Sequence, residues 1–173
     1  MKIVVQNTEL DFGKIPVLST DDSTVMYTDE WSATVLYNDY ELDFEFDESS
    51  FKEKDSSVVK IDWVLIEEFV EHILENIESI QEKGSFVLEE LHRQIFGEDN
   101  LNKNKGYFEV AGIKLEDYRK VERKYGFEKS YFKYQIIYLL DSEKGYLMDP
   151  YHSYTAKFSS HNGLTIIGVS REG

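Results

Sequence analysis

Alternation of apolar and polar residues gives the clearest structural signal in this chain. It runs through residues 31–37 and again through residues 40–47, where large apolar side chains occupy every second position. A period of two is typical of a half-buried β-strand, and Asn38-Asp39 between the two runs tolerates the positive φ of a tight turn. We therefore predict a β-hairpin whose second strand has one apolar face and one acidic face.

A helical period follows this hairpin. Apolar side chains recur every three or four positions over residues 62–80, and Asp62 is placed to cap the first turn. Gly84 stands where a helix commonly ends, and Ser85 would cap a second helix with a similar pattern. A third, shorter helix is predicted over residues 115–125. The middle of the chain thus predicts a helical hairpin and one further helix.

Strand patterns return in the last third of the chain. Alternation over residues 131–140 and 154–158, and an apolar run over residues 164–169, predict a β-meander with Asn162-Gly163 as a tight turn. Strands, then helices, then strands are typical of an α+β fold. We expect one domain over residues 1–173, a mostly antiparallel sheet with the helical hairpin and the third short helix packed on one face.

Composition excludes several kinds of protein. The chain has 173 residues and no cysteine, so a disulfide framework, a thiolate metal site and a cysteine nucleophile are ruled out. Its 34 acidic and 19 basic residues give a net charge of −15, which disfavours binding to nucleic acid or to an anionic membrane. No apolar stretch is long enough for a signal peptide or a membrane helix, and we expect a cytoplasmic protein.

The charge is distributed unevenly along the chain. Residues 1–100, which hold the predicted acidic β-hairpin and helical hairpin, contain 25 acidic and 7 basic residues, a net charge of −18. Residues 101–173, which hold the short helix and the C-terminal β-meander, contain 9 acidic and 12 basic residues, a net charge of +3. Such an asymmetry bears on the choice of partner and on association rate rather than on fold.

Catalytic signatures are missing from the sequence. It contains no Gly-x-Ser-x-Gly elbow and no glycine-rich phosphate loop, and we single out no catalytic residue, metal ligand or cofactor. Glu68 and His72 lie four residues apart on the first predicted helix, which could bring a carboxylate and an imidazole together. A small hydrolase or metal-dependent enzyme built around His72 or His152 therefore stays open as an alternative function.

A basic cluster interleaved with aromatic residues lies in the second part of the chain. Lysines that bind phosphates and aromatic rings that stack on bases would be the nucleic-acid interpretation of this pattern. Acidic residues within the same segment nearly halve its charge, so we interpret the cluster as the surface of a helix. It consists of Lys114, Arg119, Lys120, Arg123, Lys124, Lys129 and Lys133.

The C-terminal segment carries a motif of its own. Residues 146–153 read Tyr-Leu-Met-Asp-Pro-Tyr-His-Ser, and Asn162-Gly163 and Ile167-Gly168 follow. This segment resembles the closing part of small uncharacterised bacterial domains that end in an Asp-x-Glu-His-Gly-like turn, some of them associated with polymorphic-toxin immunity. Tyr151 stands here in place of the Glu, and Ser153 in place of the Gly. The resemblance implies a small α+β protein with an immunity role, and it transfers no catalytic residue.

These observations favour a binding protein over an enzyme. We predict a non-enzymatic acidic module, an immunity-type inhibitor of a basic protein toxin, whose partner-facing residues are Glu41, Asp43, Glu45 and Asp47. Like charges on one strand face repel one another, and a docking surface for a basic partner would put that field to use. A structural or regulatory subunit that oligomerises through a sheet edge is a further alternative.

Overall fold

The computed structural model describes residues 1–17, 26–38, 40–51, 59–97, 99–122, 128–145 and 147–173. In these residues the chain forms nine strands, two α-helices and one 3-10 helix. In chain order the elements are β1 (Lys2–Val5), β2 (Thr8–Asp11), β3 (Gly13–Val17), β4 (Met26–Tyr37), β5 (Tyr40–Asp47), η1 (Glu48–Phe51), α1 (Trp63–Phe96), α2 (Asp99–Asn104), β6 (Gly106–Glu122), β7 (Glu128–Ser142), β8 (Ser153–Ser159) and β9 (Thr165–Glu172).

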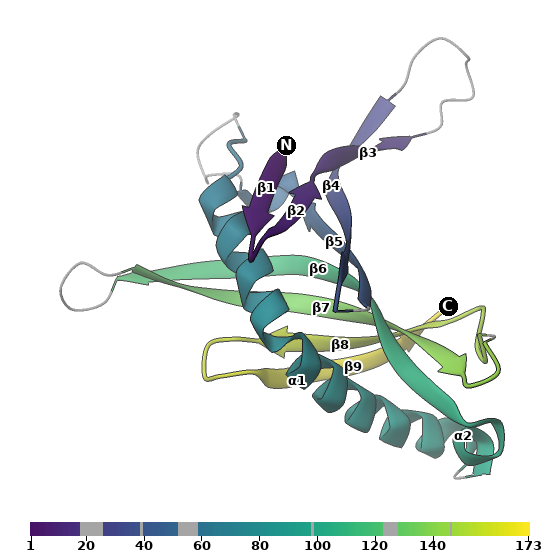
Figure 1. Cartoon of the computed structure of the whole chain (residues 1–173). Coiled ribbons are helices and arrows are strands. Elements are labelled where there is room, and N and C mark those ends of the chain that lie inside the picture. The colour runs from purple at the N-terminus through teal and green to yellow at the C-terminus, as the bar shows by residue number, and fades with distance from the viewer. Residues whose placement is uncertain (18–25, 39, 52–58, 98, 123–127, 146) are drawn as a thin grey trace.

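Seven of the strands form one sheet in the order β3-β4-β5-β6-β7-β8-β9, which is also their order along the chain. All neighbours are antiparallel except β5 and β6, which run parallel and are joined through α1. Figure 1 shows α1 crossing one face of this sheet, with the small β1–β2 hairpin beside its N-terminal part. The chain therefore combines a mostly antiparallel sheet with helix on one face, as the sequence predicts.

The core lies between α1 and the sheet. The apolar stripe of α1 is buried, and it meets the inward side chains of β4 to β8 in one continuous cluster. Near the start of α1 this cluster is aromatic: the ring of Phe46 lies 5.6 Å from that of Phe12 and 5.9 Å from that of Trp63. In the described part of the chain, no helix combines the length and the hydrophobicity needed to cross a membrane.

The predicted helical hairpin is wrong, because α1 continues unbroken through Gly84 and Ser85. A Cβ atom at Gly84 would overlap the hydroxyl of Tyr138, so this glycine permits a close approach of helix and sheet. Ser85 does not cap a second helix; its hydroxyl donates to the carbonyl of Phe108 on β6 at 3.2 Å. The cap predicted at Asp62 is confirmed, since its carboxylate accepts from the Leu65 amide at 3.2 Å.

The third short helix is also wrong, because residues 115–122 belong to strand β6, while residues 123–125 lie outside the described residues. The register of β6 against β7 shifts between Leu115 and Asp117, which marks a β-bulge at Glu116. The bulge places Leu115 and Tyr118, three residues apart, on the inward side of the strand. A spacing of three in a bulged strand imitates the period of a helix.

The strands predicted in the β-hairpin and in the C-terminal meander are present in the structure. The β4–β5 hairpin is confirmed with Tyr37 opposite Tyr40, and Asn38 has the positive φ of 47° that such a turn requires. Its partner in the turn, Asp39, lies outside the described residues. The three C-terminal strands pair as a meander, and the Asn162-Gly163 turn joins β8 to β9 with φ of 80° at Gly163.

Candidate functional site

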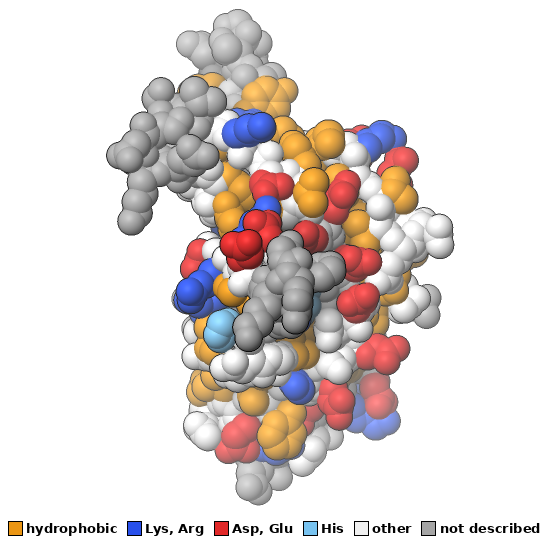
Figure 2. Space-filling view, turned by 90° about the vertical axis from the view of Figure 1, so that its left-hand side faces the viewer, with side chains coloured by type: hydrophobic (Ala, Val, Ile, Leu, Met, Phe, Trp, Pro, Cys, Tyr) orange, Lys and Arg blue, Asp and Glu red, His pale blue; other side chains and the backbone are white. Residues whose placement is uncertain are grey.

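The face of the sheet opposite α1, here called the outer face, carries most of the charged side chains that the strands contribute. On β5 the predicted alternation is confirmed: Leu42, Phe44 and Phe46 are buried beneath α1, and the acidic residues point the other way. Figure 2 shows one side of the molecule, where Asp and Glu side chains spread more widely than Lys and Arg. On this side of the molecule, acidic side chains therefore cover more of the surface than basic ones.

The four acidic residues predicted to face a partner fall into two pairs. Glu41 and Asp43 are exposed, whereas Glu45 and Asp47 are half-buried. Within the described residues, the carboxylate of Glu41 makes no hydrogen bond or ion pair, and that of Asp43 accepts a single hydrogen bond, from the Thr34 hydroxyl at 2.5 Å. The first pair thus keeps most of its hydrogen-bonding capacity available.

Glu41 and Asp43 line a shallow hollow of about 440 Å³, here called the acidic hollow. Its wall also contains Glu109 from β6 and Asp141 from β7, so four carboxylates from three strands face one space. The remaining lining is apolar, and no basic side chain belongs to it. The lining residues are Leu36, Glu41, Asp43, Glu109, Val110, Ala111, Leu139 and Asp141.

Strand register explains how these residues meet. The parallel pairing of β5 with β6 sets Asp43 beside Gly112, and the antiparallel β6–β7 pairing sets Glu109 opposite Leu139. Asp141 pairs with Tyr107, whose pKa is raised by burial and then by the negative charges of Glu109, Asp141 and Glu143. Burial is thus the main cause of the raised pKa of Tyr107, and the three nearby carboxylates, which gather at this end of β6, raise it further.

Sequence reasoning missed Glu109 and Asp141 because nothing local distinguishes them from the chain's other acidic residues. They stand far from Glu41 in the sequence and join it only through the β5–β6 and β6–β7 pairings. The parallel β5–β6 pair spans the whole of α1, and no short-range pattern predicts that contact. These two residues could have been assigned to the site only if the order and register of the strands had been known.

The second predicted pair serves local structure. The carboxylate of Asp47 accepts from the Ser49 amide at 2.7 Å, and hydrogen bonding by Ser49 lowers the pKa of Asp47. Glu45 lies beside Lys114, whose ammonium pairs with Glu30 at 2.6 Å. Burial raises the pKa of Glu45, the charge of Lys114 opposes this, and the charges of Glu30 and Asp43 add to it.

The alternative function, a small hydrolase or metal-dependent enzyme built around His72 or His152, requires a catalytic or metal site at one of these histidines. His72 on α1 lies 3.2 Å from the hydroxyl of Tyr134 and packs its ring on Phe132. Burial, and then the charge of Lys129, lower the pKa of His72. Across the described residues, no group of three or more His, Asp or Glu side chains could hold a metal ion.

His152 belongs to a polar cluster that fastens the last strand, here called the C-terminal clasp. Its Nδ1 lies 2.6 Å from a carboxylate oxygen of Asp149, and the other oxygen accepts from Arg171 at 2.8 Å and from the Tyr154 hydroxyl at 3.0 Å. Burial, and then the hydrogen bond to Asp149, raise the pKa of Tyr154 to about 12. The geometry joins β9 to the segment before β8.

The described members of the basic cluster lie on strands β6 and β7 and not on the helix that the sequence predicts. Lys114 pairs with Glu30 and Lys120 with Asp62, each at 2.6 Å, so part of its charge is neutralised. Arg123 and Lys124 lie outside the described residues. The remaining members, Arg119, Lys129 and Lys133, face the distal end of the β6–β7 hairpin, opposite to the acidic hollow.

Comparison with other proteins adds no family to this picture. The chain matches no protein-family model, no curated protein and no solved structure. The candidate site therefore rests on its own geometry and charge.

Proposed function

We propose that this chain is a non-enzymatic binding protein, an immunity-type inhibitor that holds a basic protein toxin on the outer face of its sheet. The observation that carries the proposal is the acidic hollow, where Glu41, Asp43, Glu109 and Asp141 surround an apolar floor without a basic neighbour in the lining. Two of the four carboxylates of β5 that the sequence singles out, Glu41 and Asp43, are joined in this hollow by one from β6 and one from β7.

Charge complementarity supports a basic protein as the occupant. A net charge of −15 draws a cationic partner in and speeds its association, and it repels nucleic acid and anionic lipid. Arginine and lysine side chains of such a partner would find carboxylate acceptors spaced over three strands. The C-terminal resemblance to domains associated with toxin immunity agrees with the same kind of partner.

The hollow also offers an apolar anchor point. Leu36 at its rim is 71% exposed and pairs with Glu41 close to the turn of the β4–β5 hairpin. Protein interfaces generally combine a few desolvated apolar or aromatic anchors with a polar rim. In this proposal Leu36 and Leu139 contact an apolar group of the toxin, and the four carboxylates bind the cations around it.

Site-specific crosslinking tests this function in cells that naturally produce the protein. A photo-crosslinking phenylalanine analogue in place of Leu36 should capture a basic protein, whereas the same analogue in place of Phe86, which is 75% exposed on α1, should not. Co-expression of this chain should then relieve the toxicity of the captured protein. Capture of the same proteins from both positions, or a captured protein that stays toxic, would overturn the proposal.

A further inference from the structure

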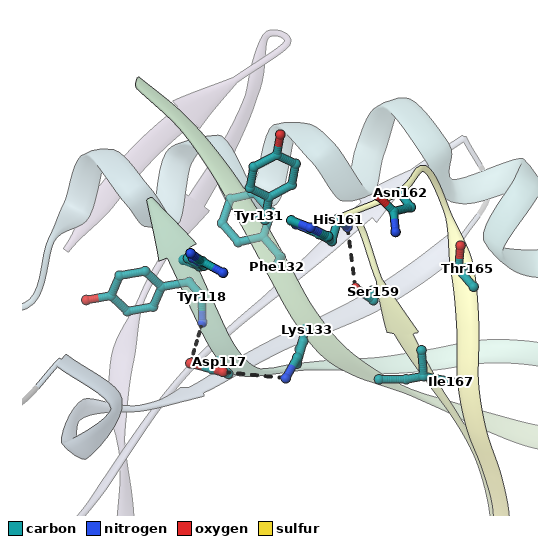
Figure 3. A pocket seen from close by; sticks show the side chains of 11 residues that line it. Asp117, Tyr118, Tyr131, Phe132, Lys133, Ser159, His161, Asn162, Thr165 and Ile167 are labelled. Carbon is teal, nitrogen blue, oxygen red and sulfur yellow. Dashed lines mark hydrogen bonds and ion pairs between the residues drawn. The ribbon is translucent and has the colours of Figure 1, made fainter. Parts of the chain in front are cut away.

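A second hollow, of about 430 Å³, opens on the outer face at the distal end of the β6–β7 hairpin. Figure 3 shows its lining, to which four strands and the β8–β9 turn contribute. Here it is called the Tyr131 pocket, and its character is opposite to that of the acidic hollow. The side chains that matter for its chemistry are Arg119, Tyr131, Lys133, His161, Asn162 and Ile167.

Strand register builds the floor of the Tyr131 pocket. One row of paired residues crosses β6 to β9, from Asp117 through Lys133 and Ser159 to Thr165. In the next row Arg119 pairs with Tyr131. Neighbouring strands lie about 5 Å apart, so Arg119 and Lys133, which are diagonal neighbours on one face, can reach the same small group.

The β8–β9 turn forms a fixed wall. The Ser160 amide donates to the Phe132 carbonyl at 3.0 Å, and the Phe132 amide donates to the Ser160 hydroxyl at 2.8 Å. These two bonds hold the turn against β7 and bring the His161 ring to 4.8 Å from that of Tyr131, edge to face. The pocket is therefore largely formed before any ligand arrives.

The positive charge of the Tyr131 pocket is only partly balanced by carboxylates. Within the described residues the side chain of Arg119 has no hydrogen bond and no ion pair, and that of Lys133 has only a long ion pair of 3.9 Å with Asp117. Asp117 also accepts from the Tyr118 amide at 2.9 Å. Lys129 adds a third cation 5.6 Å from the centre of the Tyr131 ring. In a chain with a net charge of −15, a concave site where cations outnumber their carboxylate partners is unexpected.

We propose that the Tyr131 pocket binds a small organic anion, a phosphate or carboxylate carried on a ring-sized apolar group. The anion lies between Arg119 and Lys133, where a guanidinium fork and an ammonium suit either group. The apolar part lies against Tyr131 and Ile167, and the amide of Asn162 is placed to hydrogen-bond its polar edge. A hollow of this size falls in the range of small-molecule sites.

Calorimetric titration of the full chain tests this site with four probes: AMP, adenosine, inorganic phosphate and 4-hydroxyphenylacetate. We expect AMP or 4-hydroxyphenylacetate to bind, and adenosine, which lacks the anion, to bind at least about tenfold more weakly than AMP. Preference for AMP identifies a phosphate ligand, and preference for 4-hydroxyphenylacetate identifies a carboxylate. Failure of both to bind at concentrations up to about 1 mM would overturn the proposal.

Variants separate this site from general electrostatics. Arg119→Gln should weaken binding of the preferred probe about tenfold. Lys105→Gln makes the same change in net charge at the opposite end of β6, roughly 40 Å away along the strand, and should leave it unchanged. Equal affinity in wild type and Arg119→Gln would contradict the site. Neutralising Glu41 and Asp43 should not affect probe binding, so the result is independent of the proposed toxin surface.

Discussion

The hydroxyl of Tyr138 on β7 donates a hydrogen bond to the main-chain carbonyl of Ile80 on α1 at 2.8 Å, in the space that the missing side chain of Gly84 leaves open. The side chain of Tyr138 thus reaches from the sheet to the backbone of α1. Burial, and then the nearby Tyr134, raise the pKa of Tyr138 far above its usual range, so the hydroxyl stays a donor. This contact sets how closely α1 approaches the sheet.

Gly84→Ala should destabilise the fold by about 1–3 kcal/mol, because the added methyl group overlaps the Tyr138 hydroxyl in a packed core. Urea unfolding measures the change. Gly13→Ala is the control, since a Cβ atom at Gly13 meets no atom within 4 Å. In the Tyr138→Leu background, which removes the hydroxyl and also the ring carbon Cζ that the added methyl group overlaps, the cost of Gly84→Ala should shrink, and strictly additive costs would argue against the overlap.

The same contact shows why the helical hairpin could not be predicted from sequence. A glycine followed by serine indicates a helix end when only local propensity is considered. At Gly84 the decisive partner, Tyr138, lies 54 positions later in the chain, and packing overrides propensity. The bulge at Glu116 explains the wrong prediction of a third helix in a similar way. One extra residue changed the spacing of inward side chains from two, as in a regular strand, to three, which resembles a helix.

What the sequence did predict is local in origin. The β4–β5 hairpin follows from strict alternation and a turn that accepts positive φ, and the cap at Asp62 follows from a short polar side chain before an apolar stripe. Two of the four carboxylates of the acidic hollow, Glu41 and Asp43, were predicted to face a partner because the same alternation places them on the polar side of β5. Glu109 and Asp141 were not, because they depend on long-range strand pairing.

Asp62→Ala should cost about 1 kcal/mol by removing the cap of α1, and Asp62→Asn, which can still cap, should cost less. The hydrogen bond from Lys120 is the main cause of the lowered pKa of Asp62. Since this folded-state pKa lies below the unfolded one, the stabilisation is present above about pH 4 and is lost as pH falls through the folded pKa. Unfolding free energies that differ equally at all pH values would contradict this.

Asp149→Asn should destabilise the C-terminal clasp by about 1–3 kcal/mol, because Arg171 would lose its partly buried carboxylate partner. Burial alone would raise the pKa of Asp149, but hydrogen bonds from His152, Arg171 and Tyr154 outweigh it and lower the pKa. The contribution is therefore present near neutral pH and lost on acidification. Hydrogen exchange of β9 amides should rise in this variant, while that of β4 amides should not.

Glu45→Gln should stabilise the fold near neutral pH. Burial raises the folded pKa of Glu45 above its unfolded value, so ionisation costs stability as pH rises through that window. The gain over wild type should disappear below about pH 4, where both states are protonated. Thermal unfolding across this range measures it. A variant less stable than wild type at pH 7 would show that the electrostatic attraction between Glu45 and Lys114 outweighs burial.

The central claim, that the acidic hollow binds a basic protein, is tested most directly by the salt dependence of affinity for the protein crosslinked at Leu36. Two variants are compared, and each of them loses four negative charges. One replaces the carboxylates of the hollow: Glu41→Gln, Asp43→Asn, Glu109→Gln and Asp141→Asn. The other replaces exposed carboxylates of α1: Glu67→Gln, Glu71→Gln, Glu75→Gln and Glu78→Gln.

We expect the hollow variant to lose about 100-fold in affinity at low salt and most of the salt dependence, because its carboxylates bind the partner's cations. The α1 variant should keep its affinity within about threefold, since its charges act only at long range. Equal losses in the two variants would mean that net charge alone governs binding. An unchanged affinity in the hollow variant would contradict the account outright.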